Sequence, residues 1–404
     1  MKPTPAAEKY SPLYFLASVG AGGLVVTFFM YLMFWVPHPG RPVATFDDIA
    51  AYWPTAGLPA QAAIVIAMIG IAVFAVMNLQ KLFWNISTFN TWRKTEGYKV
   101  FRTTNAETQL LAYPLALAMS VNGLFMVSLT FVPGLWNVVE YLFPFAIAGF
   151  LAIGAFALLI IGDFLGRVLT TGGVFDVTAH NSFAQLLPTF ALAMVAVGLA
   201  APAAMSSTPF VVSAGVMLST FFGMAAVIYG LIALFTAFNS MLHYGTAKEA
   251  APTLMIVIPI LTTLGIMMLR QSHGLHGTFE VHTNAGETMV FLSRMLSIQF
   301  LFLFLGMLIL IRQGYFKDFV LGDKLSPGSY ALVCPGVAIS VMLHFFINTG
   351  LVSAGIIEKF GTIYWIESAV AIGFQLATVW LVFRLNGQHF AKVAEAPGDV
   401  VAAE

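Results

Sequence analysis

The chain has 404 residues, of which 59% are hydrophobic and 9% are charged, and its formal net charge is zero. Because a soluble domain carries about 25% charged residues, this composition indicates a polytopic membrane protein and excludes an ordinary soluble domain. The lack of net charge gives no overall attraction to nucleic acid. The single cysteine, Cys334, excludes an intrachain disulfide and a cysteine-rich metal or iron–sulfur site within one chain.

Ten apolar runs, each near the roughly 20 residues that a helix needs to cross a bilayer, predict an all-α protein. They cover about 13–36, 60–82, 108–131, 138–161, 181–200, 210–238, 252–270, 289–311, 328–350 and 361–383. Residues 13–383 then form one transmembrane domain of ten helices. Residues 1–12 and 384–404 are short tails, and the second is expected to be disordered because it is rich in alanine and lies at the chain end.

Several of these runs begin with signals that favour a helix start. Thr104 with Glu107, and Asn284 with Glu287, have the spacing of a capping box. Three prolines occupy positions where a helix can begin, namely Pro59, Pro209 and Pro252. The loop at about 37–59 is longer than the other outer loops, and we expect it to cap the outer mouth of the bundle.

The basic residues predict the orientation in the membrane. When the N-terminus is placed in the cytoplasm, four of the 18 Lys and Arg residues fall outside, namely Arg41, Arg270, Arg294 and Lys359. The other 14 (18 − 4) fall on the cytoplasmic side, which is the bias that the positive-inside rule describes. An odd number of spans would break this alternation, so we expect both termini in the cytoplasm.

Four prolines recur at nearly even intervals of 74, 71 and 76 residues, namely Pro114, Pro188, Pro259 and Pro335. They fall in the third, fifth, seventh and ninth spans, and the first span carries Gly20, Gly22 and Gly23 instead. Proline removes a backbone donor and breaks a helix, and glycine loosens one. The pattern predicts five parallel helical hairpins, each with an odd member kinked at mid-membrane inside the bundle. The alternative is the ordinary enrichment of Gly and Pro in membrane helices.

Small polar groups on the odd spans are candidates for lining a passage, namely Ser18, Asn122, Thr189, Thr262 and His344. Hydroxyls, amides and loosened backbone N–H groups can donate hydrogen bonds to an anion. The alternative is that they satisfy carbonyls beside the prolines or hold helices together. Lys and Arg are not expected near the middle of any odd span, which favours weak binding and passive flow of anions.

Ionisable groups within the spans are few. His344 and Glu367 are candidates for a proton-coupling group, and each also fits a structural role. Asp163 and Arg167 lie one helical turn apart and are expected to form an ion pair.

The segment from His273 to His282 holds three histidines and a carboxylate, which are suitable metal ligands. Its spacing matches no zinc signature, and Gly274 and Gly277 favour a turn, so a solvated outer loop is predicted, with a metal site as the alternative. His344 is the one histidine well inside a span, whereas a bundle haem needs a matched pair, and a nucleophile paired with a base does not stand out. We therefore predict neither a metal, nor a cofactor, nor an enzyme.

The arrangement resembles the family of the plant slow anion channel and the bacterial tellurite-resistance transporter homologue, which includes yeast-type malate and sulfite transporters. The resemblance rests on Ser18-Val-Gly-Ala-Gly-Gly23, Tyr113-Pro114, Leu187-Pro188, Ile258-Pro259 and Cys334-Pro335-Gly336. It covers about residues 13–383. It implies a pore with fivefold pseudo-symmetry in each protomer, lined by the kinked odd helices, and commonly a homotrimer. It also points to a bacterial inner membrane.

One residue departs from the family pattern. In the channel members a phenylalanine on the ninth helix blocks the pore, and Cys334 takes that place in this chain. A thiol cannot fill the same space, so the gate is expected at Cys334 itself or at Tyr113, Leu187 or Ile258, each of which precedes its proline. The leading hypothesis is an anion channel or uniporter for small inorganic or carboxylate anions. The alternative is a coupled secondary transporter or exporter of C4-dicarboxylates, or of oxyanions such as sulfite or tellurite.

Overall fold

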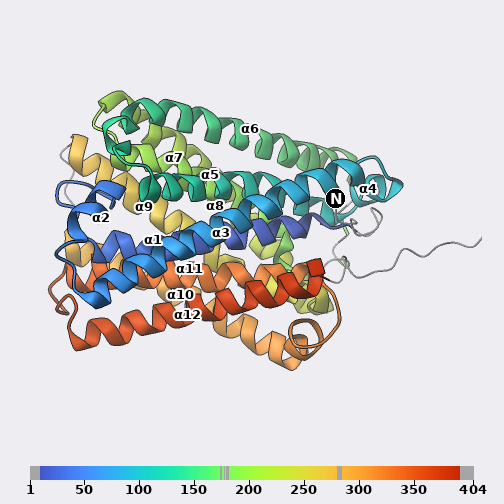
Figure 1. Ribbon diagram of the computed structural model, residues 1–404. Helices are drawn as coiled ribbons and strands as arrows, with labels where there is room; N and C mark the ends of the chain where they lie inside the picture. Colours follow the sequence, from blue (N-terminus) through green and yellow to red (C-terminus); the bar gives the residue numbers. More distant parts are fainter. Residues whose placement is uncertain (1–9, 173–174, 177, 179–181, 280–283, 392–404) are drawn as a thin grey trace, which may run out of the picture.

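The computed structural model describes all residues except 1–9, 173–174, 177, 179–181, 280–283 and 392–404. Within the described residues, ten helical segments are long and apolar enough to cross a membrane, as predicted. Their long axes run roughly along one direction (Figure 1). The N-terminal end of the chain and the last described residues lie at the same end of the bundle, which we call the N-terminal end. An even number of spans requires this placement.

Burial divides the ten segments into two sets. In the first, third, fifth, seventh and ninth segments, 61–100% of the most apolar 18-residue window is buried, against 22–33% in the others. The inner segments are Pro12–Trp35, Asn105–Phe131, Phe183–Met205, Lys248–Phe279 and Pro327–Val352. The outer helices are α3 (Leu58–Trp92), α6 (Val139–Thr171), α8 (Pro209–Tyr244), α10 (Ala285–Arg312) and α12 (Thr362–Asn386).

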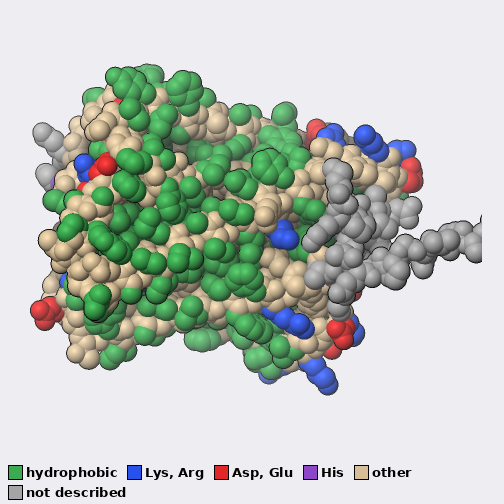
Figure 2. Space-filling view, viewed as in Figure 1, with side chains coloured by type: hydrophobic (Ala, Val, Ile, Leu, Met, Phe, Trp, Pro, Cys, Tyr) green, Lys and Arg blue, Asp and Glu red, His purple; other side chains and the backbone are tan. Residues whose placement is uncertain are grey.

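The inner segments enclose a common axis. Their α-helical parts are α1 (Phe15–Trp35), α5 (Ala112–Phe131), α7 (Leu187–Met205), α9 (Val257–Phe279) and α11 (Val333–Phe345). In that order each helix contacts the next, and α11 returns to contact α1, so the ring is closed. Each inner helix also packs against the outer helix that follows it in the chain. The outer helices face the surroundings with apolar side chains, which cover the middle of the molecule while charged side chains gather near its ends (Figure 2).

Every inner segment begins with a 3₁₀ turn before it becomes α-helical. These turns are η2 (Pro12–Tyr14), η3 (Asn105–Leu111), η5 (Phe183–Leu186), η6 (Lys248–Met255) and η8 (Pro327–Leu332). They contact one another in the same cyclic order as the helices that follow them. The N-terminal end of the inner bundle therefore holds a closed collar of five 3₁₀ turns.

The periodic prolines lie at these junctions between 3₁₀ turn and α-helix. Pro188 is the second residue of α7, and Pro114, Pro259 and Pro335 are each the third residue of their α-helix. The first turn of an α-helix tolerates proline because its N–H groups have no intrahelical acceptor. The 3₁₀ turn therefore ends two to four residues before each periodic proline, and the kinks themselves stay a prediction.

Three of the five predicted helix-start signals are confirmed by the structure and two are not. Asn284 and Glu287 form the predicted capping box, and Pro59 and Pro209 lie in the first turn of α3 and α8. Thr104 and Glu107 do not cap each other, because Glu107 instead pairs with two arginines. Pro252 lies inside η6 and not at a helix start.

The final span extends past residue 383 through Asn386 and a π-helical turn, Gly387–Ala391, so a tail does not begin at 384.

Candidate functional site

A cavity of about 150 Å³ lies inside the ring of inner helices. All five inner helices contribute to its wall, together with Pro42 and Val43 from the segment after α1. The side chains that line it come from these elements and not from the outer helices. Most are apolar, among them Met30, Met119, Phe190 and Phe345. The cavity therefore lies along the axis of the inner ring and offers few polar groups to a solute.

Arg270 on α9 brings a positive charge to this wall. Its side chain is partly buried, and Nη1 donates a hydrogen bond to the carbonyl oxygen of Val197 on α7 at 2.8 Å. Within the described part of the chain, Arg270 forms no ion pair with a carboxylate. A guanidinium has five N–H donors, so most of its hydrogen-bonding capacity is available to a solute in the cavity.

The predicted end of the seventh span at Arg270 is wrong, because α9 continues to Phe279. Gly274 explains the continuation, because a Cβ at this position would collide with the backbone carbonyl of Ala203 on α7. Its lack of a side chain lets α9 run closely against α7 beyond the predicted end. Arg270 consequently lies within α9 and not at the end of the span.

The same continuation corrects the predicted loop from His273. The described part of that segment, up to Phe279, is helical, and His273 lines the cavity one turn after Arg270. A cluster of three or more His, Cys, Asp or Glu suited to a metal does not occur within the described residues. Glu280 and His282 lie outside the described residues, so they add nothing to the metal alternative.

Of the residues predicted to line a passage, five line the cavity, namely Gly20, Asn122, Pro259, Thr262 and Cys334. The donors of two of them are already used within the protein. Asn122 Nδ2 donates to the Ala118 carbonyl at 3.1 Å, and Thr262 Oγ1 lies 3.2 Å from the Ala338 carbonyl. The first bond lies within α5 and the second joins α9 to α11, so Arg270 is the stronger hydrogen-bond donor to an anion.

The remaining predicted lining residues do not lie in the cavity wall: Ser18, Gly22, Pro114, Pro188, Thr189, Pro335 and His344. Ser18 Oγ donates to the carbonyl of Asn78 on α3 at 3.0 Å, and Thr189 is buried against Gly230 of α8. Gly22 lies against Met119 and Asn78. His344 is fully buried behind the wall. Because a helix has 3.6 residues per turn, residues of one inner helix face in all directions, and only some of them face the cavity.

The candidate gate residues Tyr113, Leu187 and Ile258 lie at the collar, outside the cavity wall. Leu187 and Ile258 are fully buried, and the ring of Tyr113 stacks on that of Phe15 with centroids 4.6 Å apart. Cys334, the fourth candidate, lines the cavity directly above the collar. The Tyr113 ring also contacts Phe89 of α3 and Phe156 of α6, so of the four candidates Cys334 alone lines the cavity.

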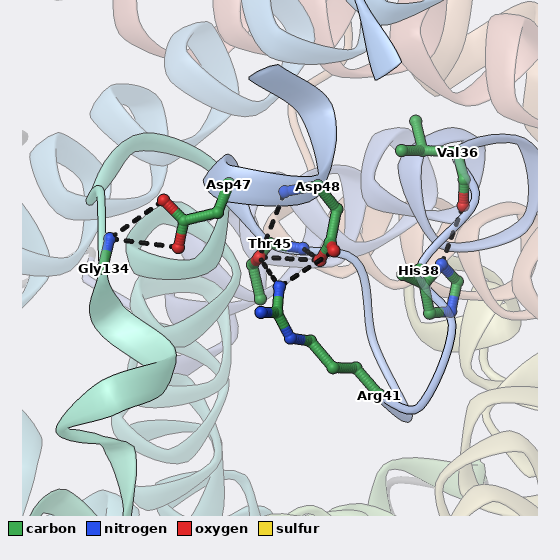
Figure 3. Close-up of polar contacts among 7 residues, drawn as sticks. All are labelled: Val36, His38, Arg41, Thr45, Asp47, Asp48 and Gly134. Carbon is green, nitrogen blue, oxygen red and sulfur yellow. Dashed lines mark hydrogen bonds and ion pairs between the residues drawn. The ribbon is translucent and has the colours of Figure 1, made fainter. Parts of the chain in front are cut away.

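The segment between α1 and α3 contributes Pro42 and Val43 to the cavity wall and contains the short helix α2 (Phe46–Tyr52) (Figure 3). Thr45 and Asp48 form a capping box, and Arg41 Nη1 pairs with Asp48 Oδ1 at 2.8 Å. Asp47 accepts hydrogen bonds from the Gly134 N–H at 3.1 and 3.2 Å, which fastens the segment to the turn after α5. These contacts hold Pro42 and Val43 at the cavity wall.

The Arg41–Asp48 pair predicts a pH dependence. Burial raises the pKa of Asp48, but hydrogen bonds from Thr45 and Arg41 outweigh it and leave the pKa below the ordinary value. The stabilisation is therefore complete above about pH 4 and is lost as the pH falls through the lowered pKa. A ¹³C carboxyl titration should show Asp48 titrating below about 3.9, and Arg41→Gln should raise its midpoint. A midpoint at or above the ordinary value in the parent protein would contradict this contact.

A buried carboxylate fastens the collar to the outer layer. Glu107 in η3 is fully buried and pairs with Arg167 of α6 and, at 2.6 Å, with Arg102. Asp163 lies 3.5 Å from Arg102 and is 67% exposed. The predicted pair between Asp163 and Arg167 is therefore wrong, because Arg167 turns toward Glu107. Arg167 pairs with Glu107 and not with Asp163 because Glu107 is buried away from water and needs a countercharge.

We expect Glu107→Gln to destabilise the protein by about 3 kcal/mol, because two guanidiniums lose their shared carboxylate. The value is at the low end for buried pairs since the arginine side chains are 33% and 28% exposed. Thermal unfolding in detergent measures the change. Asp163→Asn is the matched control and should change stability by at most about 0.5 kcal/mol. Equal effects of the two substitutions would contradict the assignment.

Comparison with protein-family models gives no match, and comparison with curated proteins gives no match either. The shape and charge of the cavity are therefore the basis for a functional proposal.

Proposed function

We propose that this protein is a membrane anion channel or uniporter that passes small anions through the cavity of each protomer. The ten apolar helices are compatible with a membrane transport protein. The observation that carries the proposal for anions is Arg270, a guanidinium at the wall of an otherwise mostly apolar cavity, without a carboxylate partner among the described residues.

The size of the electrostatic effect favours transport over tight binding. Two unit charges 4 Å apart attract by about 4 kcal/mol at an effective dielectric constant of about 20. This attraction alone corresponds to a dissociation constant of about 1 mM, before the cost of removing water from the anion. One such charge is enough to favour anions over cations. It is too weak to hold an anion for long, as conduction requires.

The proposal also includes the repeated hairpins, the oligomeric state and the orientation in the membrane. The closed ring of inner helices, each starting with a 3₁₀ turn, supports five repeated hairpins with approximate fivefold symmetry. The resemblance to the slow anion channel and tellurite-resistance family supports a homotrimer in a bacterial inner membrane. The excess of basic residues on one side supports cytoplasmic termini. In this orientation the collar closes the cytoplasmic end of the cavity, and the segment with α2 covers the outer end.

A coupled secondary transporter of dicarboxylates or oxyanions is the second candidate, and His273 favours it. A coupled carrier needs a titratable group at the transport site, and His273 lines the cavity one turn from Arg270. The two candidates differ in how transport responds to a proton gradient. A channel conducts without one, whereas a proton-coupled carrier accumulates substrate only when a gradient is imposed.

Flux into liposomes that contain the purified protein tests the proposal. The assay compares chloride, nitrate, sulfite and malate, with and without a pH gradient. We expect flux of at least one small anion down its own gradient at equal pH, and none of potassium. Strict dependence on the pH gradient would favour the carrier, and the absence of flux for every anion would contradict both candidates.

A further inference from the structure

A second polar region lies between α1, α11 and α12, behind the cavity wall. Its side chains are Tyr31 and Trp35 from α1, Ser340, His344 and Asn348 from the ninth span, and Tyr364, Ser368 and Gln375 from α12. We call it the polar seam. Ser340 and His344 are fully buried and do not line the cavity, although their neighbours Val341 and Phe345 do. The seam is therefore separated from the cavity by the α11 backbone.

Contacts at both ends fix the register of α11 against α12. At one end Gly336 lies against Thr378, where a Cβ on Gly336 would collide with the threonine hydroxyl. At the other end the Tyr364 hydroxyl donates to Asn348 Oδ1 at 3.0 Å. Ser340 and His344 lie between these two contacts on α11, and Ser368 and Gln375 lie between them on α12. Polar side chains therefore lie on both α11 and α12 where the two helices face each other.

The α1 side of the seam is closed by aromatic rings. Tyr31 donates its hydroxyl to Gln375 Oε1 at 2.5 Å, and Trp35 Nε1 donates to the Tyr364 hydroxyl at 2.9 Å. The ring centroids of Tyr31 and Trp35 lie 5.8 and 6.4 Å from that of His344. The imidazole therefore lies among groups whose hydrogen bonds run to one another and not to it.

Four side chains of the seam keep polar atoms without a hydrogen-bond partner in the described residues. They are Ser340 Oγ, both ring nitrogens of His344, Ser368 Oγ and Gln375 Nε2. Each of these residues is fully buried and belongs to a segment long and apolar enough to cross a membrane. An unsatisfied polar group is costly there, since neither water nor lipid provides a partner from outside.

We propose that the polar seam is a binding site for water inside the membrane domain, with Ser340, His344 and Gln375 as its ligands. A buried water needs two to four polar partners, and these side chains offer both donors and acceptors. Neutral imidazole accepts at one nitrogen and donates at the other, so His344 can bridge two water molecules. The site is distinct from the cavity and does not depend on anion transport.

Hydroxyl-radical labelling by X-ray radiolysis tests this site, because bound water generates the radical beside the side chains it contacts. The comparison uses Tyr31, which contacts Gln375 and His344, and Tyr315, which lies outside the seam; both are buried and hydrogen-bonded through their hydroxyls. We expect labelling of Tyr31 several times faster than that of Tyr315 in protein reconstituted in lipid. Labelling of Tyr31 at or below the rate of Tyr315 would overturn the proposal.

Ser340→Ala provides a second readout. If the hydroxyl had no partner, its removal would delete an unsatisfied group and raise the melting temperature. If it binds water, its removal takes a ligand from that water, and the melting temperature should fall by about 1–3 °C. Ser120→Ala is the control, because Ser120 Oγ is buried and donates only to the Ala116 carbonyl of its own helix. A rise for Ser340→Ala relative to this control would also count against the proposal.

Discussion

Arg270→Gln should reduce chloride flux by about tenfold or more and weaken the preference for anions over potassium. The substitution removes the guanidinium charge at the cavity wall while an amide can still donate to the Val197 carbonyl. A tenfold change corresponds to about 1.4 kcal/mol, which is well within the attraction of about 4 kcal/mol expected at 4 Å. Chloride efflux from liposomes and the ratio of chloride to potassium permeability are the measurements.

Two further variants separate charge from shape. Arg270→Lys keeps the charge and should retain most of the flux. Arg294→Gln is the matched control, because Arg294 lies on outer helix α10, is exposed and does not line the cavity. If Arg270→Gln conducts chloride as the parent does while remaining folded, the anion-attracting role of this residue is wrong.

Cys334→Phe should block most of the flux. Cys334 is 5% exposed and lines the cavity next to the collar, where the wall is closely packed. A phenyl ring cannot fit the space of a thiol, so it either projects into the cavity of about 150 Å³ or strains the surrounding helices at a cost of about 1–3 kcal/mol. The first outcome closes the passage, and liposome flux at matched protein content measures it.

Cys334→Ser serves as the control for this block, since it keeps the size of the side chain. Its flux should be close to that of the parent. The melting temperature and elution profile of Cys334→Phe show whether the folded state is kept. Undiminished flux through folded Cys334→Phe would mean that Cys334 does not face the conduction path.

The sequence predicted the features of the fold that depend on composition and on length. Ten apolar runs of spanning length became ten membrane-competent helices, because burial of an uninterrupted apolar run in lipid dominates local preferences. The spans with periodic Pro or Gly proved to be the buried set, since closely packed inner helices favour residues that allow backbones to approach.

Features decided by contacts between distant residues could not be predicted. Arg167 pairs with Glu107, 60 residues away, and not with Asp163 on its own helix. The sequence favours a turn at Gly274, yet the contact of this residue with Ala203 of α7 lets the helix continue. Arg270 was missed as a lining residue for the same reason. Sequence spacing indicates local turns and caps, whereas partners across the bundle depend on how the helices pack.

The reversal potential of the current carried by many copies in a planar bilayer tests the central claim most directly. Under a tenfold gradient of potassium chloride, a passage selective for chloride should reverse close to the chloride equilibrium potential, about 59 mV in magnitude. The parent protein is expected to give this value, and Arg270→Gln a value nearer zero. A reversal potential at the potassium equilibrium value would contradict an anion pathway beside Arg270.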